Sequence, residues 1–345
     1  MHKIIEEDLK FIIGHKIDWE LLRDKTVLIS GINGLLPSYM AYTMLYLNKK
    51  GYNIRIIGIA RSKERAYAKF FGFKDNKNLQ LMIQDICDPI DINEEINYII
   101  HAASHASPKY YGIDPVGTLL PNVLGTYRLL ELAREKNVDG FLFFSTGDVN
   151  GDVAEDQIPT SEDIYGGLDP LALSSSYAES KRMGENMCFS WNHQYGVPAK
   201  IVRPTHTYGP GMKLDDARVF ADFVSDIVNN RDIVVKSDGL ATRAFCYIAD
   251  ATVGFFQVLF KGDPAKAYNV GSDVETSIGD LAKLLVGLFP EKGLKVVMGK
   301  GSCAKECARS KKVRGAADIK SIKKLGWKIE HTVEEGFKRT VRSYI

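Results

Sequence analysis

The sequence has few cysteines, and they do not form a recognisable framework. There are five in 345 residues, an odd number, and they are scattered along the chain except for Cys303 and Cys307. A disulfide-stabilised secreted protein usually has more, in even number. A structural zinc site usually needs four ligands, and no further Cys or His lies near Cys303 and Cys307. We therefore expect neither a disulfide scaffold nor a metal site, and the reducing cytoplasm is the simplest location.

A large excess of charge and a long apolar run are also missing. Lysine and arginine number 45, and aspartate and glutamate number 43, which gives a net charge of +2. This balance removes the basic field that non-specific binding to nucleic acid or to an anionic membrane requires. One basic segment lacks interleaved aromatic residues and contains Lys305, Arg309, Lys311, Lys312 and Arg314. The N-terminus resembles neither a signal peptide nor a membrane anchor, so we expect no nucleic-acid and no membrane partner.

What the sequence does contain is an alternation of short apolar runs with helical patterns. Residues 1–25 indicate a helical lead-in, and Thr26–Ser30 is the first apolar run. Further apolar runs follow between helical segments, at residues 54–60, 79–83, 98–102, 140–145 and 199–202. Strands that alternate with helices predict an α/β fold with a Rossmann-like, doubly wound parallel sheet. Such sheets bind ligands at the carboxyl ends of their strands.

A glycine-bearing turn follows the first predicted strand. It reads Gly31-Ile32-Asn33-Gly34, and a helical pattern begins at Leu35. Glycine lets the backbone approach a pyrophosphate closely, and the helix N-terminus offers N–H groups to it. We therefore predict a dinucleotide contact at Gly31, Asn33, Gly34 and Leu35, although Pro37 stands where a third glycine is usual and an ordinary strand-to-helix turn is the alternative.

Two further positions bear on the identity of the dinucleotide. Arg61 follows the second predicted strand, where folds that select NAD usually carry an acid. An arginine there can pair with a 2′-phosphate, which favours NADP, or can simply be solvated. Asp85 and Ile86 follow the third strand, where the aspartate can bind the adenine amino group or cap a turn. The sequence leaves NAD and NADP open.

A tyrosine and a lysine four residues apart are the main catalytic candidates. Tyr177 and Lys181 lie on one helix face, and an ammonium near a phenol lowers the pKa of the phenol, so the tyrosine can act as a base. An exposed helix pair is the alternative. Ser145, Thr146 and Asp148 follow an apolar strand and place hydroxyls and a carboxylate where a substrate can meet the tyrosine.

Together these features resemble the extended short-chain dehydrogenase/reductase family that acts on nucleotide sugars. The resemblance extends from about residue 25 to the C-terminus and includes the segment Asn122-Val123-Leu124-Gly125-Thr126. Within the family, the closest likeness is to UDP-glucuronate decarboxylases, at residues 101–108 (HAASHASP), 114–116 (DPV), 208–210 (YGP), 242–247 (TRAFCY) and 325–327 (LGW).

The resemblance implies roles for the candidate residues. Tyr177 takes the proton of the sugar 4-hydroxyl, Thr146 hydrogen-bonds that oxygen, and Lys181 holds the nicotinamide ribose, while Asp148 completes the catalytic set. The remaining implied contacts are Ala102, Ala103 and Ser104 for the cofactor and His206, Arg218, Arg243 and Arg314 for the substrate. Arg218 and Arg314 also suit a diphosphate because guanidinium binds phosphate bidentately, but each can equally be a surface arginine.

Several positions depart from the decarboxylase pattern and leave the reaction open. Asp148 stands for a glutamate, Gly147 for a serine, Asn150 for a tyrosine, His206 for an asparagine, and Ser174 for an arginine. A C4 ketone can lose CO₂, eliminate water or be reduced on the other face. Decarboxylase, 4-epimerase and 4,6-dehydratase therefore remain, with a degenerate dinucleotide-binding sensor as the non-enzymatic alternative.

The resemblance also predicts the organisation of the chain. We expect residues 1–25 to be the lead-in, residues 26–204 mainly the dinucleotide-binding part, and residues 205–345 mainly the part that binds a nucleotide sugar, interleaved with the first. Members of the family commonly form homodimers through two helices of each subunit, and residues 119–135 and 177–195 match those helices.

Overall fold

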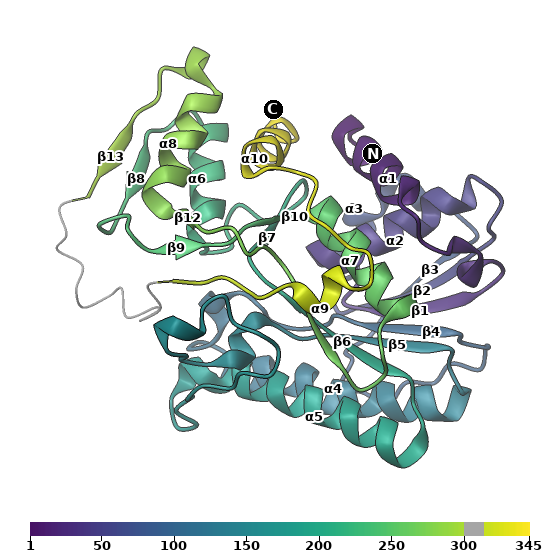
Figure 1. The fold of residues 1–345 in the computed structure, drawn as a ribbon. Coiled ribbons are helices and arrows are strands. Elements are labelled where there is room, and N and C mark those ends of the chain that lie inside the picture. The colour runs from purple at the N-terminus through teal and green to yellow at the C-terminus, as the bar shows by residue number, and fades with distance from the viewer. Residues whose placement is uncertain (300–313) are drawn as a thin grey trace.

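A seven-stranded parallel β-sheet is the centre of the computed structural model, which describes residues 1–299 and 314–345 (Figure 1). In space the strands follow the order β11-β6-β5-β4-β1-β2-β3, and every neighbouring pair is parallel. Their bounds are β1 (Thr26–Ser30), β2 (Arg55–Ala60), β3 (Leu79–Ile83), β4 (Tyr98–His101), β5 (Gly140–Phe144), β6 (Ala199–Pro204) and β11 (Ala267–Val270). The predicted doubly wound α/β fold is confirmed.

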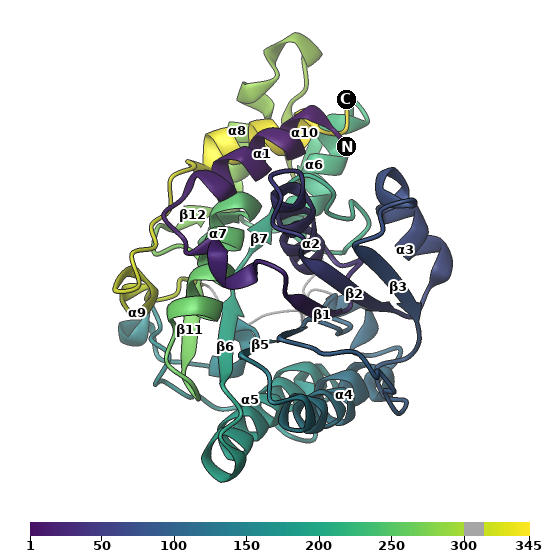
Figure 2. The ribbon, with the colours of Figure 1, turned by 90° about the vertical axis from the view of Figure 1, so that its right-hand side faces the viewer.

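Both faces of this sheet are buried under helices. Along β1, Val27 and Ile29 pack into the core on one face, and Leu28 packs into the core on the other. This alternation explains why the strands are apolar throughout. One face is covered by α4 (Pro115–Lys136) and α5 (Ser176–Tyr195), and the other by α1 (Lys3–Gly14), α2 (Leu35–Asn48) and α7 (Ile248–Lys261) (Figures 1 and 2). The short helix α3 (Lys63–Lys69) lies between β2 and β3 in the chain.

The seventh strand was not predicted. β11 has four residues and comes from the C-terminal part of the chain, where α7 leads back to the sheet and β11 pairs with β6. Its sequence, Ala-Tyr-Asn-Val, is too short and mixed to indicate a strand by itself.

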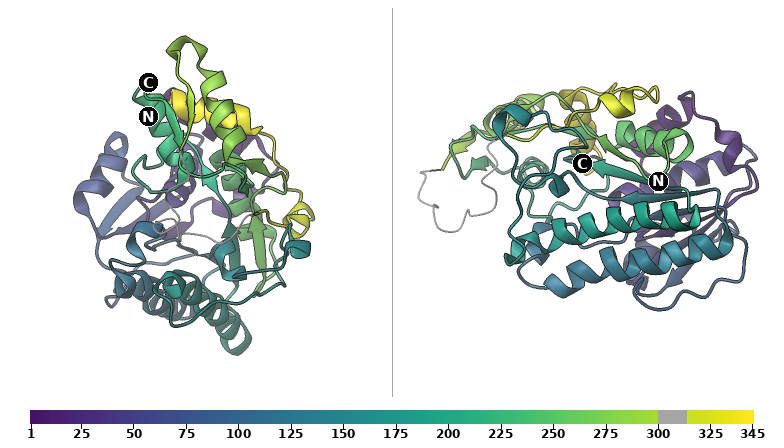
Figure 3. Two further views of the ribbon diagram at one scale, coloured as in Figure 1. Left: turned by 90° about the vertical axis from the view of Figure 1, so that its left-hand side faces the viewer. Right: turned by 60° about the horizontal axis from the view of Figure 1, so that its bottom comes forward.

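The rest of the C-terminal part lies beyond the carboxyl ends of the strands (Figures 1 and 3). Its strands form three small two-stranded sheets, β7 (Thr207–Tyr208) with β10 (Cys246–Tyr247), β9 (Thr242–Arg243) with β12 (Thr276–Ser277), and β8 (Ile233–Val235) with β13 (Val296–Met298). Its helices are α6 (Val219–Val228), α8 (Ile278–Leu288), α9 (Lys320–Lys323) and α10 (Val333–Arg342). This part covers the edge of the sheet where ligands are expected.

The N-terminal helix ties the two parts together. Asp8 of α1 is buried and accepts hydrogen bonds from the hydroxyls of Tyr39 (3.0 Å) and Tyr247 (2.9 Å). Arg339 Nη2 of α10 donates to Asp8 Oδ1 at 2.7 Å, so α1 and α10 lie side by side (Figure 2). Burial raises the pKa of Asp8, against the lowering influence of Arg339. The carboxylate thus joins α2 to the C-terminal helix α10.

Two expectations from the sequence concern a membrane partner and the residues between 300 and 313. In residues 1–299 and 314–345, no helix has both the length and the apolar character required to span a membrane. Cys303, Cys307 and the basic residues Lys305, Arg309, Lys311 and Lys312 lie outside the described residues.

Candidate active site

The predicted site residues come from the carboxyl ends of several parallel strands, which share one edge of the sheet. Gly31 follows β1, Arg61 follows β2, Ala102 follows β4, Thr146 follows β5 and His206 follows β6. Because the strands are parallel, these positions face the same region beneath the C-terminal part.

At Gly31 the glycine turn leaves no room for a side chain. Gly31 has φ +66°, and a Cβ there would lie 2.7 Å from Ala103 Cα, so only glycine fits. Gly34 is the N-cap of α2, and no side chain of the described residues caps that helix. Asn33 and Leu35 flank this cap. The backbone N–H groups at the start of α2 therefore keep the arrangement that binds a pyrophosphate.

Pro37 fits this turn without disturbing it. It lies in the first turn of α2, where a missing N–H is no loss, and a Cβ on Gly34 would be 3.2 Å from Pro37 Cγ. Pro37 is buried and packs against the glycine cap. The departure from a third glycine is therefore compatible with the predicted dinucleotide contact.

The loop after β4 lies against the glycine turn. Ser30 Oγ at the end of β1 accepts hydrogen bonds from the amides of Ala102 (3.1 Å) and Ala103 (3.2 Å). His101 is fully buried between Ser30 Oγ (2.7 Å) and Thr126 Oγ1 (3.0 Å), and burial lowers its pKa to about 3. The buried Ser104 Oγ has no hydrogen-bond partner among the described residues. An orphaned hydroxyl beside a backbone cradle fits a polar ligand at this point.

At the ends of β2 and β3, Arg61 is already engaged by the protein. Its Nη1 lies 3.7 Å from Asp85 Oδ2, and its Nη2 contacts His105 Nε2. Asp85 Oδ1 accepts from the Cys87 amide at 2.9 Å, so this aspartate also caps a turn. Although partial burial acts to raise it, the Cys87 hydrogen bonds and the Arg61 charge hold the pKa of Asp85 below its usual value. Ile86 is buried and lies directly against Gly125.

The predicted catalytic residues meet where β5 ends against α5. Tyr177 and Lys181 are buried on α5, and Thr146 lies near enough to the Tyr177 hydroxyl to act to lower its pKa. Lys181 Nζ donates to the Phe144 carbonyl at 2.6 Å and lies 5.9 Å from the centre of the Tyr177 ring. Thr146 Oγ1 accepts from the amide of Asp148, an exposed residue, at 3.2 Å. A phenol, a hydroxyl and an ammonium thus share one small volume.

The pKa shifts in this group follow from burial. Burial and the Asp148 charge raise the pKa of Tyr177, against the lowering influence of Thr146 and Arg218. This direction is opposite to the one expected from the spacing of Tyr177 and Lys181, because the cost of burying a phenolate outweighs the lowering influences. Burial lowers the pKa of Lys181 to about 7, although Glu185 acts to raise it.

On the substrate side, His206 and Arg243 are neighbours. A Cβ on Gly315 would lie 3.4 Å from Arg243 Cδ and 3.7 Å from His206 Nε2. His206 has φ +37°, a left-handed conformation that few side chains adopt. Burial lowers the pKa of Arg243 while the Asp148 charge acts to raise it, which brings Asp148 into the same cluster.

The two other arginines of the predicted substrate set are paired with carboxylates of the chain. Arg218 forms an ion pair with Asp216, and its charge also acts on Tyr177. Arg314 binds Glu275 through two contacts, Nη2 to Oε1 at 2.5 Å and Nε to Oε2 at 3.2 Å. Glu275 also accepts from Thr242, the neighbour of Arg243 in β9. Glu275 therefore connects Arg314 to Thr242, next to the cluster of His206, Arg243 and Asp148.

Two departures from the decarboxylase pattern have local structural reasons. A Cβ on Gly147 would lie 2.9 Å from Thr205 Cγ2, so a serine there requires Thr205 to move. Asn150 is buried and donates through Nδ2 to the carbonyls of Ile164 (2.6 Å) and Ser161 (3.3 Å), which fixes the loop after the site. Ser174 is exposed.

Sequence reasoning missed two residues beside the catalytic group. The ring of Tyr111 stacks on Tyr177 with centroids 5.1 Å apart and planes 14° apart, and the Tyr111 hydroxyl donates to Ala106 O at 3.1 Å. No spacing in the sequence links these two tyrosines. Glu185 is one helical turn beyond Lys181, and the repeated four-residue spacing of Tyr177, Lys181 and Glu185 is a signal that could have indicated it.

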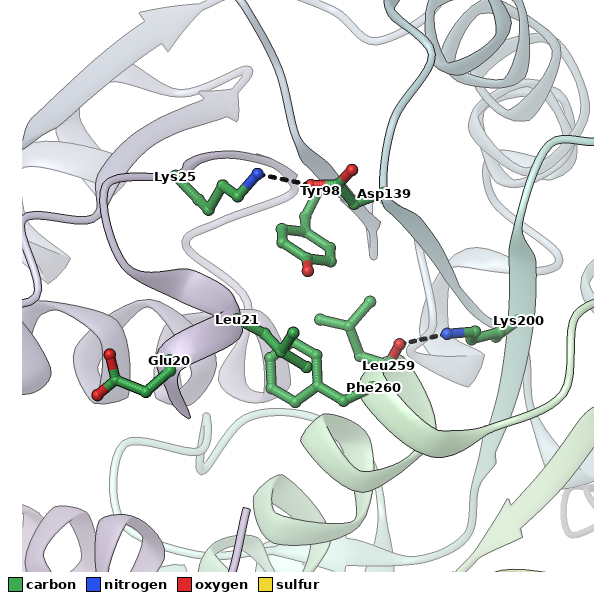
Figure 4. A pocket seen from close by; sticks show the side chains of 8 residues that line it. All are labelled: Glu20, Leu21, Lys25, Tyr98, Asp139, Lys200, Leu259 and Phe260. Atoms are coloured by element: carbon green, nitrogen blue, oxygen red, sulfur yellow. Dashed lines mark hydrogen bonds and ion pairs between the residues drawn. The ribbon is translucent and has the colours of Figure 1, made fainter. Parts of the chain in front are cut away.

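A pocket of about 490 Å³ lies at the opposite edge, by the amino ends of the strands (Figure 4). It is lined by Glu20, Leu21, Lys25, Tyr98, Asp139, Lys200, Leu259 and Phe260. Its lysines are engaged, since Lys25 Nζ binds Asp139 Oδ2 at 2.9 Å and Lys200 Nζ donates to Leu259 O at 2.5 Å. The pocket is far along the strands from the predicted catalytic residues and contains none of them.

The comparisons with known proteins agree with the family resemblance found in the sequence. The family model described as "NAD dependent epimerase/dehydratase family" matches residues 27–271. The chain is 32% identical over 276 residues to UDP-glucuronic acid decarboxylase 6 of Arabidopsis thaliana, which covers 77% of this chain and 76% of that protein.

Two solved structures are similar in fold. The UDP-glucose 4-epimerase of Thermotoga maritima, solved with UDP-glucose, has a TM-score of 0.77 at 23% identity and covers 92% of this chain and 98% of its own. The UDP-glucuronic acid 4-epimerase of Bacillus cereus, in complex with UDP-glucuronic acid and NAD, has a TM-score of 0.77 at 20% identity, with the same coverage of 92% and 98%.

Proposed function

Because this chain belongs to the NAD dependent epimerase/dehydratase family, we propose that it modifies a nucleotide sugar through transient oxidation at C4. The observation that carries the proposal is the burial of Thr146, Tyr177 and Lys181 together at the edge of the sheet that carries the glycine turn. A tyrosine with a hydroxyl partner and a nearby ammonium suits proton transfer to and from a sugar hydroxyl.

The residues around the glycine turn fit a dinucleotide. The closeness of Gly31 to Ala103 and the backbone at the start of α2 suit a pyrophosphate contact by Gly31, Asn33, Gly34 and Leu35. Arg61, Asp85 and Ile86 would hold the adenosine end, and Ala102, Ala103, Ser104, Tyr177 and Lys181 the nicotinamide end. When bound, the cofactor supplies the oxidant for C4 and later the reductant.

The side chains of this protein carry out the proton transfers. Tyr177 acts in its phenolate form, which its burial disfavours in the free protein, and takes the proton of the 4-hydroxyl as the C4–H bond breaks, which leaves a ketone at C4. Thr146 donates a hydrogen bond to the same oxygen, and Lys181 supplies a positive charge one helical turn away. At the end of the cycle Tyr177 returns its proton to the C4 oxygen.

For the product we propose decarboxylation of a UDP-hexuronic acid. A 4-ketone with a carboxylate at C6 is a β-keto acid, so cleavage of the C5–C6 bond releases CO₂, and the electron pair becomes a C5 enolate that then takes up a proton. Support comes from Arg218 and Arg243, two guanidinium groups whose surroundings include Tyr177 and Asp148. It also comes from the names of the curated relatives. A 4-epimerase and a 4,6-dehydratase are the alternatives.

The experiment is a mass-spectrometric assay of the purified protein with NAD and a panel of UDP-glucuronate, UDP-glucose and a dTDP-hexose. Loss of 44 mass units from UDP-glucuronate supports decarboxylation. An isobaric epimer, or loss of 18 units from another sugar, contradicts decarboxylation but supports C4 oxidation. Tyr177→Phe is the inactive comparison, and Tyr67→Phe, an exposed tyrosine on α3, is its matched control. No conversion of any sugar, with cofactor bound, would favour a sensor.

Between the two cofactors we propose NAD. Arg61 lies near Asp85 and His105, and the Asp85 carboxylate would repel a 2′-phosphate placed on the same guanidinium. Equilibrium binding of NAD and NADP to wild type and to Arg61→Ala tests this. Tighter binding of NAD by both proteins is expected, and tighter binding of NADP by wild type would contradict the proposal.

We also propose a homodimer formed by α4 and α5. These helices pack against each other on the surface and expose apolar side chains, namely Val116, Leu120, Tyr127, Met183 and Phe189. Sedimentation at micromolar concentration should give twice 38.5 kDa for wild type and a smaller species for Leu120→Glu. A monomeric wild type would overturn this part of the proposal.

A further inference from the structure

A buried ion pair lies directly behind the catalytic residues. Arg203 of β6 is completely buried, and the side chain of Glu185 on α5 is 9% exposed. Arg203 Nη2 binds Glu185 Oε2 at 2.7 Å, and Arg203 Nε binds Glu185 Oε1 at 2.8 Å. Arg203 also donates to Glu162 O at 2.8 Å and to the hydroxyl of Tyr165 at 2.9 Å. The pair is therefore bidentate and has further partners.

The pair extends to the residue just before Thr146. Ser145 Oγ donates to Glu185 Oε1 at 2.5 Å. The neighbouring carbonyl, that of Phe144, accepts from Lys181 Nζ at 2.6 Å. Two successive residues at the end of β5 are thus held by α5, Phe144 by Lys181 and Ser145 by Glu185, and the next residue, Thr146, lies beside Tyr177.

Such a pair is not a good way to stabilise a core. Desolvation of two charges costs about as much as their attraction returns, and well-packed apolar residues often replace a buried pair at no loss of stability. What a bidentate pair does provide is fixed geometry. Here the geometry that it fixes is the distance between the end of β5 and α5, the two elements that supply the catalytic hydroxyl and the catalytic phenol.

We propose that Ser145, Glu185 and Arg203 form a positioning network that holds Thr146 beside the Tyr177 hydroxyl. In this proposal the network acts on the reaction through the positions of Thr146 and Lys181, and its own members are positioning residues. This inference rests on the proposed function for its kinetic consequence, but its structural consequence can be measured without any sugar.

Ser145→Ala is the cleanest test, because it removes one hydroxyl and leaves the Glu185–Arg203 pair in place. A displacement of about 1 Å at a reacting group costs about 100-fold in rate, so we expect kcat to fall about 10- to 100-fold with KM little changed. The matched control is Thr252→Val, which removes a fully buried hydroxyl that bonds Ile248 O at 2.7 Å on α7, away from the site. This control should keep wild-type kcat.

The second measurement uses only protein and NAD. In protein labelled with ¹³Cζ-tyrosine, the Tyr177 resonance is assigned by its absence in Tyr177→Phe. A displacement of Thr146 from the Tyr177 hydroxyl should shift this resonance in Ser145→Ala and not in Thr252→Val. If wild type converts no nucleotide sugar, the proposed function fails, and the resonance alone decides the inference. An unshifted resonance with unchanged kcat overturns it.

A double variant separates positioning from stability. Glu185→Leu combined with Arg203→Met replaces the pair by apolar side chains of similar size. If the network serves geometry, this protein should unfold near the wild-type temperature and yet lose kcat to the same degree as Ser145→Ala. A folded double variant with wild-type kcat would overturn the inference.

Discussion

The two sides of the candidate site hold their polar groups in different ways. On the side predicted to be catalytic, Thr146, Tyr177 and Lys181 are all less than 10% exposed, and Lys181 is bound to the end of β5. On the substrate side, the side chains of Arg218 and Arg314 are each 39% exposed and pair with carboxylates of the same part of the chain. The first arrangement is rigid, whereas the second can exchange its partners for those of a ligand at modest cost.

The departures from the decarboxylase pattern fall outside the buried group of Thr146, Tyr177 and Lys181. Thr146, Tyr177 and Lys181 are retained, while Gly147, Asp148 and His206 differ, and Gly147 and Asp148 belong to the loop that faces the sugar-side arginine Arg243. A C4 oxidation needs one fixed geometry whatever the sugar. Recognition of the sugar needs different groups for different substituents. We therefore propose that the shared chemistry belongs to the buried side and the specificity of this protein to the exposed side.

The largest effect should come from the catalytic side. Tyr177→Phe removes the proton acceptor but leaves the ring and its stacking on Tyr111 in place. We expect kcat to fall about 10²- to 10⁴-fold with cofactor affinity retained. Stopped-flow turnover and equilibrium NAD binding measure the two quantities. Turnover within a few fold of wild type would show that Tyr177 is not the proton acceptor. It would also contradict the proposal that the buried side carries the chemistry.

The next effect concerns stability and pH. The pKa of Lys181 is about 7 in the folded protein and about 10.5 when unfolded, so between these values the unfolded chain binds more protons. The Lys181 contribution to the free energy of unfolding therefore rises as the pH rises through this window. Between pH 7 and pH 9, wild type should gain about 2 to 3 kcal/mol relative to Lys181→Met.

Urea unfolding of the cofactor-free proteins at the two pH values measures this gain. Lys16→Met, which changes an exposed lysine, is the matched control and should follow wild type. Parallel pH profiles for wild type and Lys181→Met would show that the Lys181 ammonium is not held in a desolvated position.

How far the sequence predicts this division can be seen residue by residue. The six predicted strands, the glycine turn and the four-residue spacing of Tyr177 and Lys181 are local patterns, and local patterns are visible in one sequence. The stacking of Tyr111 on Tyr177 and the binding of Glu185 by Arg203 join elements far apart in the chain. The direction of the Tyr177 pKa depends on burial, which the spacing alone does not give. β11 was not predicted because its four residues are too few to show a strand pattern.

On the substrate side, Arg243 should matter more than the other arginines. It lies beside His206 and in the field of Asp148. Arg243→Leu should raise KM for the nucleotide sugar about 10- to 100-fold, as loss of a charged hydrogen bond does, with NAD affinity unchanged. Arg243→Lys, which keeps the charge but not the fork, should recover part of the loss. Initial-rate kinetics decide, and an unchanged KM would exclude Arg243 from the binding of the sugar or diphosphate.

The smallest effect should come from Arg314. Its guanidinium is bidentate on Glu275, so a phosphate must compete with a carboxylate that is already in place. We expect Arg314→Gln to raise KM about 3-fold, which is less than the effect of Arg243→Leu. A phosphate that binds Arg314 must first break the ion pair with Glu275, and this cost reduces the net contribution of Arg314 to binding. Glu275→Gln is the matched change on the other partner, and by releasing Arg314 it should lower KM. If both variants raise KM as much as Arg243→Leu, then the ion pair itself shapes the substrate site, and the exposed side is as rigid as the buried one.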